Sequence, residues 1–362
     1  MPDMAAPATR LKLDQQALLP ADPHAGPAAC HAALASGGAD FLQLILAQGL
    51  GPLWHHRLQT GGRLDALPQD AAEALREARL SAAGGYLAQR AALDRLDRLF
   101  EAAGIAWLVM KGAHVRECVY PDPALRPAGD IDILVAPADR RRAARALLDA
   151  GYAVHAEPAN ISHEATFSHG GVDIDLHWHI LRPGRTRVGL TEQLLERRQR
   201  SGGQWGPSDG DTLFLMLTHP AFAKYVCSPN MGLGRVADFL LWLQQRPADW
   251  PGVVKQLDDA GLKTAAWAML SWFRLLAPAA LQATLDAWRG SVRPGRLRAA
   301  YLRQWLLRDL PGRWLQRPLL IQFGFTLPLH DRPGDALHAL RGVRQARKNR
   351  QHDLGLLLGE ST

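Results

Sequence analysis

The chain has 362 residues, of which 47% are hydrophobic and 21% charged, which is typical of a soluble globular protein large enough for two or three domains. Its 42 lysines and arginines against 35 aspartates and glutamates give a net charge of +7, so an anionic partner is plausible: a nucleotide, a nucleic acid or a membrane surface. Cys30, Cys118 and Cys227 are far apart, which excludes a disulfide framework or a cysteine metal site and favours a reducing cytoplasm.

No targeting or membrane-spanning segment is expected. Residues 1–16 lack the apolar core of a signal peptide. No apolar run is long enough to span a bilayer. The closest, residues 264–281, is interrupted by Arg274 and Pro278, and it is expected to be a buried helix.

Residues 1–95 are predicted to form an N-terminal helical region. Within it, residues 1–36 contain scattered Ala, Pro and Gly and are expected to be loosely ordered. Helical periodicity begins at Ala39 and is broken at 49–52. Residues 67–104 are then predicted to form helices, with a break or weak point expected at Gly84 and Gly85 and an end at Gly104.

Residues 96–185 are predicted to form a core of strands and helices. Short apolar runs at 105–111, 130–135 and 152–156 indicate strands, with helices between them. Two further strands flank the glycine pair at 170–171, because a tight hairpin turn of this kind requires positive φ. The predicted order β-α-β-α-β-β-β gives a small mixed sheet, so the fold class is α+β.

Residues 186–362 are predicted to form a C-terminal helical region, with a helical pattern from Thr191 to the end and a basic tail. Four tryptophans are expected to fill its core: Trp242, Trp250, Trp267 and Trp272. A solvated helical face or a specific anion-binding role would each explain the basic residues of the tail. These are Arg341, Arg344, Arg347, Lys348 and Arg350.

Carboxylates gather on two of the predicted strands. Residues i and i+2 of a strand point to the same side, so Asp130 and Asp132 project together, as do Asp173, Asp175 and His177. If the strands are neighbours, up to four carboxylates converge, and they repel one another unless cations bind. Two divalent ions ~3.5–4 Å apart serve in-line displacement at a phosphate, and Mg²⁺ suits such oxygen ligands.

Phosphate ligands are predicted close to these carboxylates. Lys111 and Gly112 lie where a strand meets a helix, and a glycine there lets backbone N–H groups approach an anion. Arg126 is a candidate to contact a triphosphate or to pair with the aspartates. In the alternative interpretation of the carboxylates, they are solvated or paired with Arg126, Arg140 or Arg141.

Three segments of the core resemble the uncharacterised nucleotidyltransferases of the DNA polymerase β superfamily. They are MKG (110–112), RPAGDIDILV (126–135) and VDIDLHW (172–178). In order, these segments resemble three features of that superfamily: a glycine motif that opens a helix, a strand with an Asp-x-Asp pair, and a later strand with a third carboxylate. The resemblance covers about residues 100–180, and more weakly the helices on either side.

The resemblance implies site residues. Asp130 and Asp132 match the metal-binding pair, and Asp175 matches the third catalytic, metal-binding carboxylate better than Asp173 does. Lys111 and Gly112 occupy the position of the glycine motif. The superfamily usually has Gly-Ser there, whereas this chain has Gly-Ala at 112–113, so the serine hydroxyl that contacts phosphate is absent and Lys111 is the candidate replacement.

The activity that the resemblance implies is metal-dependent transfer of an NMP from an NTP, ATP included, to an acceptor hydroxyl, with release of pyrophosphate. The expected cofactors are two Mg²⁺ ions, with Mn²⁺ as an alternative. The acceptor stays open among small molecules, nucleic acids and proteins. Two other functions remain open: a metal-dependent glycosyltransferase that uses a sugar nucleotide, and a non-catalytic nucleotide-binding module.

Several histidines lie near the predicted hairpin and offer a second kind of site. His163, His169, His177 and His179 are candidates for a zinc site, with hydrogen-bonded or partly exposed histidines as the alternative. His177 shares the face of Asp175 and is therefore also a candidate contact to phosphate or acceptor.

Two groups in the C-terminal region are candidates to line an acceptor pocket. The first group is His219, Lys224 and Tyr225, near the end of an apolar helix. The second is Arg235 and Asp238, which are three residues apart on one helical face, so that an internal salt bridge between them is the alternative.

Overall fold

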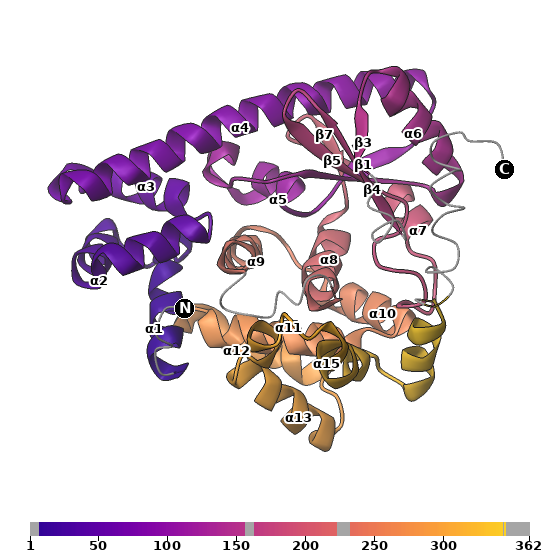
Figure 1. The fold of residues 1–362 in the computed structure, drawn as a ribbon. Coiled ribbons are helices and arrows are strands. Elements are labelled where there is room, and N and C mark those ends of the chain that lie inside the picture. Colours follow the sequence, from indigo (N-terminus) through magenta and orange to yellow (C-terminus); the bar gives the residue numbers. More distant parts are fainter. Residues whose placement is uncertain (1–6, 156–162, 223–231, 343, 345–362) are drawn as a thin grey trace.

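The computed structural model describes residues 7–155, 163–222, 232–342 and 344. A five-stranded mixed sheet is flanked by helices (Figure 1). The long helix α4 (Gln69–Ala102) runs along one side of the molecule, and the C-terminal helices pack on the opposite side. The predicted fold class, α+β with a small mixed sheet between helical regions, is confirmed.

The N-terminal helices correct the expectation that residues 1–36 are loosely ordered. Within residues 7–36 the chain forms α1 (Pro7–Ala17) and the first part of α2 (Pro27–Ala47), and α3 (Gly51–Thr60) follows in the segment that was predicted to be helical. Apolar side chains of α2 and α3 are buried against one another, and the rings of Phe41 and Trp54 meet edge to face at 5.7 Å. The Trp54 indole N–H also donates to the Ala17 carbonyl at 2.9 Å. Scattered small residues therefore still form helices here, because each helix has a buried apolar face.

Helix α2 meets the length and composition of a membrane span, with a mean hydropathy of 1.2, contrary to the expectation that no run is long enough. Its helical geometry is interrupted at Gly38, where φ is 61°. A core helix of a globular protein meets the same test, so these two properties do not by themselves indicate a span.

Helix α4 corrects a second expectation, because it passes through Gly84 and Gly85 without a break. It ends, as predicted, next to Gly104, which has a φ of 62°. The helix crosses residue 95, and its C-terminal half contributes Leu93 and Phe100 to the core beneath the sheet. The limits 1–95, 96–185 and 186–362 remain a prediction.

The sheet has the strand order β1-β2-β5-β4-β3. The strands are β1 (Trp107–Val109), β2 (Ile131–Val135), β3 (Ala153–His155), β4 (Glu164–His169) and β5 (Val172–His177). The neighbours β2 and β5 are parallel and the other pairs are antiparallel. The predicted hairpin turn joins β4 and β5 at Gly170 and Gly171, whose φ angles are 58° and 78°.

The two faces of the sheet differ in polarity. One face presents Ile131, Ile133, Ile174 and Leu176, which are fully buried against α4 and α6 (Arg140–Asp149). The opposite face carries the polar residues of β2, β4 and β5. Helix α5 (Lys111–Val119) follows β1 and contacts β2. The alternation along each strand thus separates an apolar core from a polar site.

The C-terminal region is mainly helical, as predicted, with one exception. Strands β6 (Gln199–Ser201) and β7 (Gln204–Gly206) form a hairpin around Gly202 and Gly203, and this hairpin corrects the expectation of a helical pattern throughout. The glycine pair, with φ angles of 57° and 80°, is the same turn signal as at 170–171.

The helices of this region are α7 (Thr191–Glu196), α8 (Asp209–Phe222), α9 (Leu233–Gln245), α10 (Trp250–Ala260), α11 (Lys263–Leu276), α12 (Ala279–Ser291), α13 (Arg296–Leu307), α14 (Leu310–Arg313) and α15 (Pro318–Ile321). Trp242, Trp267 and Trp272 are buried as predicted, whereas Trp250 is half-buried and stacks on Trp288 at 4.3 Å.

One hydrophobic core runs through the N-terminal and C-terminal helices. Hydrogen bonds join them as well: the Gln15 amide donates to the Leu275 carbonyl at 2.8 Å, and the Gln244 amide donates to the Ala21 carbonyl at 3.2 Å. Most of the basic tail, including Arg347, lies outside the described residues.

Candidate functional site

The predicted carboxylates lie on neighbouring strands of the polar face. In the parallel pair, Asp132 of β2 is directly opposite Asp175 of β5, and in the antiparallel pair Asp175 is opposite Thr166 of β4. The expectation that the two Asp-x-Asp strands are neighbours is therefore confirmed. Side chains in such cross-strand positions are about 5 Å apart, so the two carboxylates share one small volume.

Asp132 is buried and is neutralised by the protein itself. The Lys111 ammonium donates to its Oδ1, and His177 Nε2 lies 2.9 Å from the same oxygen. Burial opposes ionisation of Asp132, but the Lys111 charge and the His177 hydrogen bond outweigh it, and the pKa of the carboxyl lies well below its ordinary range. The predicted repulsion between carboxylates is thus relieved at Asp132 by Lys111.

Lys111 reaches this position through an uncommon backbone conformation. It has a φ of 56°, in the left-handed region that non-glycine residues rarely adopt, at the first residue of α5. Strain of this kind costs about 1–3 kcal/mol and persists where the surroundings determine it, often at functional sites. Here the side chain of the strained residue forms an ion pair with the buried Asp132.

The other three aspartates are less enclosed. Asp175 is half-buried and accepts a hydrogen bond of 2.6 Å from the Thr166 hydroxyl. Asp130 is half-buried just before β2, and Asp173 is exposed. One ligand atom from each of Asp132, Asp175 and His177 can be chosen so that all lie within 4.8 Å of one another, close enough to hold a metal ion.

Arg126 is held by a partner that the sequence interpretation did not consider. Its Nε and Nη2 donate to the Asp238 carboxylate of α9, at distances down to 2.8 Å, and Nη1 donates to the Pro127 carbonyl at 2.9 Å. The Tyr120 hydroxyl donates to the same carboxylate at 2.8 Å. The expected Arg235–Asp238 salt bridge is wrong, because Asp238 pairs with Arg126.

A cavity of about 60 Å³ opens beside these groups. The residues that line it include Lys111, Gly112, Arg126, Met216, His219 and Arg235. The Arg235 guanidinium forms no ion pair or hydrogen bond with any residue that the structure describes, and only its backbone N–H donates, to the Gly232 carbonyl at 3.0 Å. Burial and then the neighbouring Arg126 lower the pKa of Arg235. Burial and the nearby Lys111 also hold the pKa of His219 well below its ordinary value, so this imidazole is neutral. Lys224 and Tyr225 lie outside the described residues.

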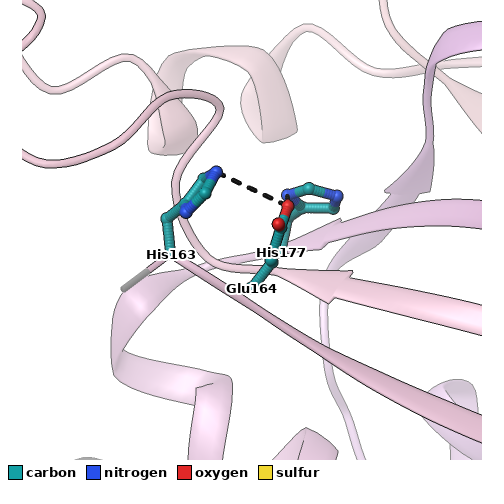
Figure 2. Close-up of side chains that lie close together, drawn as sticks. All are labelled: His163, Glu164 and His177. Atoms are coloured by element: carbon teal, nitrogen blue, oxygen red, sulfur yellow. Dashed lines mark ion pairs between the residues drawn. The ribbon is translucent and has the colours of Figure 1, made fainter. Parts of the chain in front are cut away.

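The four histidines of the predicted zinc site do not all come together. His169 lies at the turn end of β4, where its ring is 2.9 Å from Arg95 Nη1, and His179 belongs to neither of the two groups of potential metal ligands among the described residues. His163 and His177 do converge, and Glu164 joins them (Figure 2). Burial and the nearby His177 lower the pKa of His163 well below its ordinary value.

Glu164 is the residue of this group that the sequence interpretation missed. It is opposite His177 in the β4–β5 hairpin. The signal was present, because Glu164 and His177 are equally far from the Gly170-Gly171 turn, and a two-residue hairpin pairs such positions.

Comparison with known proteins identifies a family. No curated protein and no solved structure shows significant similarity to the chain. The profile of a family described as uncharacterised nucleotidyltransferase matches residues 37–278, which is more than half of the chain and includes the whole five-stranded sheet with the carboxylates of β2 and β5. The chain therefore belongs to this uncharacterised nucleotidyltransferase family.

Proposed function

We propose that the protein transfers an NMP from an NTP to an acceptor hydroxyl, with release of pyrophosphate, in a reaction that depends on a divalent metal ion. The observation that carries this proposal is the direct pairing of Asp132 with Asp175 across two parallel strands, next to Lys111 and the first turn of α5. Paired carboxylates beside a cationic phosphate-binding element are what metal-assisted displacement at phosphorus requires.

The carboxylates suit a hard divalent ion such as Mg²⁺, with Mn²⁺ as the alternative. Asp130, Asp132 and Asp175 would hold it, because carboxylate oxygens are the ligands that Mg²⁺ prefers. When bound, the metal would neutralise charge on the phosphates and on the attacking oxygen. Lys111 already supplies one positive charge to Asp132 in the structure, so the carboxylate is arranged to contact a cation.

The triphosphate contacts come from the residues around the cavity. The first turn of α5, which begins at Lys111 and Gly112, has no side-chain cap and offers free N–H groups to an anion. Arg235 lines the same cavity as a cation without an ion-pair partner among the described residues. Arg126 keeps N–H groups beyond those that bind Asp238, so a nucleotide contact remains part of the proposal.

The chain's own residues also handle the acceptor. Asp175 lies opposite Asp132 and is half-buried, so its carboxylate can orient an acceptor hydroxyl and receive its proton. His177 shares that face and supports Asp132 there through the 2.9 Å contact of its Nε2. The positions of these groups, held by the sheet, provide catalysis through orientation and charge stabilisation.

The test is a calorimetric titration of the full-length protein with each NTP in the presence and absence of Mg²⁺. It is paired with pyrophosphate release when a cell extract supplies acceptors. Wild-type protein is expected to bind an NTP only with Mg²⁺ and to release pyrophosphate. Asp175→Asn is expected to reduce turnover at least about a hundredfold, since such carboxylates act directly on the transition state.

Asp173→Asn is the matched control, because Asp173 lies on the same strand and face but is exposed. This variant is expected to behave like the wild type. Equal activity of the Asp175→Asn and Asp173→Asn variants would contradict the proposal. Tight binding of a sugar nucleotide in place of NTPs would favour the glycosyltransferase, and NTP binding without pyrophosphate release would favour the non-catalytic module.

A further inference from the structure

Three metal-ligand side chains meet at the open end of the β4–β5 hairpin. They are His163, Glu164 and His177, and Figure 2 shows the Glu164 carboxylate between the two imidazole rings. The backbone fixes all three, since Glu164 is opposite His177 in the register and the Trp178 N–H donates to the His163 carbonyl at 2.9 Å. The His163 and His177 rings are 5.8 Å apart between centroids.

The tautomer of His177 follows from its contact with Asp132. An ionised carboxylate only accepts hydrogen bonds, so Nε2, which is 2.9 Å from Asp132 Oδ1 and farther, at 3.4 Å, from the Lys111 ammonium, carries the ring proton. In the neutral ring Nδ1 then bears a lone pair. That atom is buried without a hydrogen-bond partner among the described residues, and it lies 3.2 Å from Glu164 Oε2, which is also an acceptor.

Two acceptor atoms that face each other, one on the fully buried His177 ring and the other on the partly exposed Glu164 carboxylate, are stabilised by a cation between them. The third atom of the group, His163 Nε2, lies 3.4 Å from the same Glu164 oxygen. With metal–ligand bonds of about 2.0–2.1 Å, neighbouring ligand atoms of a tetrahedral zinc site are about 3.3 Å apart. The distances from Glu164 Oε2 to the two histidine nitrogens therefore match the separation of neighbouring ligand atoms in a tetrahedral zinc site.

We propose that His163 Nε2, Glu164 Oε2 and His177 Nδ1 bind one Zn²⁺ ion. The site shares His177 with the group formed by Asp132 and Asp175 but differs from it in donor type, because two imidazole nitrogens and one carboxylate select zinc over Mg²⁺. Three protein ligands leave one coordination position for water or a substrate group. Asp132 accepts a hydrogen bond from the Nε2–H of His177 and so holds the ring in the orientation that ligation through Nδ1 requires.

A doubly protonated His177 between two carboxylates would be the competing state. Its Nδ1–H would then donate to Glu164, and no metal would be needed. The contact of 3.2 Å lacks hydrogen-bond geometry, since His177 Nδ1 has no hydrogen-bond partner among the described residues. The geometry of the three side chains therefore fits ligands arranged around one metal ion and does not fit a hydrogen-bonded His177–Glu164 ion pair.

The experiment measures metal binding and does not depend on activity. Full-length protein is stripped with a chelator, reconstituted with Zn²⁺, dialysed, and its metal content determined by mass spectrometry. Co²⁺ is used as a spectroscopic substitute, because its visible absorption distinguishes tetrahedral from octahedral coordination. Wild-type protein is expected to retain about one Zn²⁺ per chain and to give a tetrahedral Co²⁺ spectrum.

Ligand variants locate the ion. His163→Gln and Glu164→Gln are each expected to lower Zn²⁺ affinity at least about tenfold. His169→Gln is the matched control, because His169 lies on the same hairpin but contacts Arg95, and it is expected to bind Zn²⁺ like the wild type. Asp175→Asn is also expected to retain the Co²⁺ spectrum, which separates this site from the proposed magnesium site.

Several results would overturn the proposal. They are wild-type protein that retains no Zn²⁺, equal affinity in the His163→Gln variant, and loss of the Co²⁺ spectrum only in Asp175→Asn. If both ligand variants fail to fold, X-ray absorption of the zinc-loaded wild type decides, because the proposal requires two imidazole ligands. Nucleotide binding is not a readout here, so failure of the zinc site leaves the proposed function standing.

Discussion

Lys111 combines a strained backbone with a buried ion pair. Its left-handed φ of 56° costs about 1–3 kcal/mol, and its ammonium is the main positive charge next to Asp132. The side chain of Asp132 is only 9% exposed, so without Lys111 its carboxylate would be a buried charge supported by His177 alone. The residue is therefore expected to matter for stability before any ligand binds.

Lys111→Ala is expected to lower the free energy of unfolding by about 3 kcal/mol at pH 7, because breaking a buried pair leaves an uncompensated charge. The depressed pKa of Asp132 also predicts a pH dependence. The native state binds this proton less readily than the unfolded state does. The pair therefore stabilises the fold above the ordinary carboxyl pKa of about 4, and this stability is lost as the pH falls below that value.

Urea unfolding of both proteins at pH 7 and pH 3 measures the effect. The wild type should lose more stability on acidification than Lys111→Ala, because the variant has already lost the Asp132 contribution. Lys255→Ala is the control, since Lys255 is an exposed surface lysine paired with Asp259. Equal stability of the wild type and Lys111→Ala at pH 7 would show that the ion pair contributes nothing.

At the scale of elements, the start of α5 is fastened to α9 through Arg126. A Cβ atom on Gly112 would lie 2.2 Å from Arg126 Nη1, so the glycine leaves room for the guanidinium. Arg126 in turn binds Asp238, which also accepts from Tyr120. Because Gly112 has no side chain, Arg126 of the loop before β2 can pass the first turn of α5 and bind Asp238 of α9.

Gly112→Ala is expected to destabilise the fold by about 1–3 kcal/mol, because the added methyl group displaces an arginine whose carboxylate partner is buried. Gly129→Ala is the matched control. Gly129 belongs to the same loop, and a Cβ there meets no atom within 4 Å. Thermal and urea unfolding of the two variants give the comparison, and equal melting curves would show that Arg126 moves aside without cost.

The elements carrying the site could largely be predicted from the sequence. Strand alternation has a period of two, so the faces of Asp132 and Asp175 followed from sequence alone, and the glycine pair at 170–171 indicated the hairpin. The partner of Arg126 could not be predicted, because Asp238 is 112 residues away and only tertiary packing brings it near. Helix α1 and the first part of α2 could not be predicted for the same reason, because their apolar faces stabilise a helix only once they are buried.

At the scale of the whole molecule, residues 335–338 pack against the loop that follows β5. Arg187 binds Asp335 through two hydrogen bonds of 2.9 and 2.7 Å, and it also donates to the Asp258 carbonyl at 3.1 Å. Gly184 packs against the same segment, where a Cβ would lie 2.8 Å from the His338 carbonyl oxygen. Residues 335–338 therefore pack against the loop that follows the strand carrying Asp175.

The Arg187–Asp335 pair is expected to be a structural clamp with no part in the chemistry. Arg187→Gln and Asp335→Asn should each lower the free energy of unfolding by about 1–2 kcal/mol, since the two side chains are only 23% and 17% exposed and the hydrogen bonds are charge-assisted. The double variant should cost little more than either single one. Urea unfolding of the wild type, the two single variants and the double variant completes a double-mutant cycle. If the losses of unfolding free energy simply add, the pair has no coupling energy.

The parallel pairing of β2 with β5 also governs when the site forms during folding. The β4–β5 hairpin is local and closes easily, whereas Asp132 and Asp175 are 43 positions apart and meet only when β2 docks on the hairpin. A partly folded chain that has only the hairpin contains no carboxylate pair. A ligand that bridges β2 and β5 therefore binds the finished sheet alone, and its binding free energy adds to the stability of the native state. A shift in melting temperature can then identify nucleotides and acceptors without any assay of turnover.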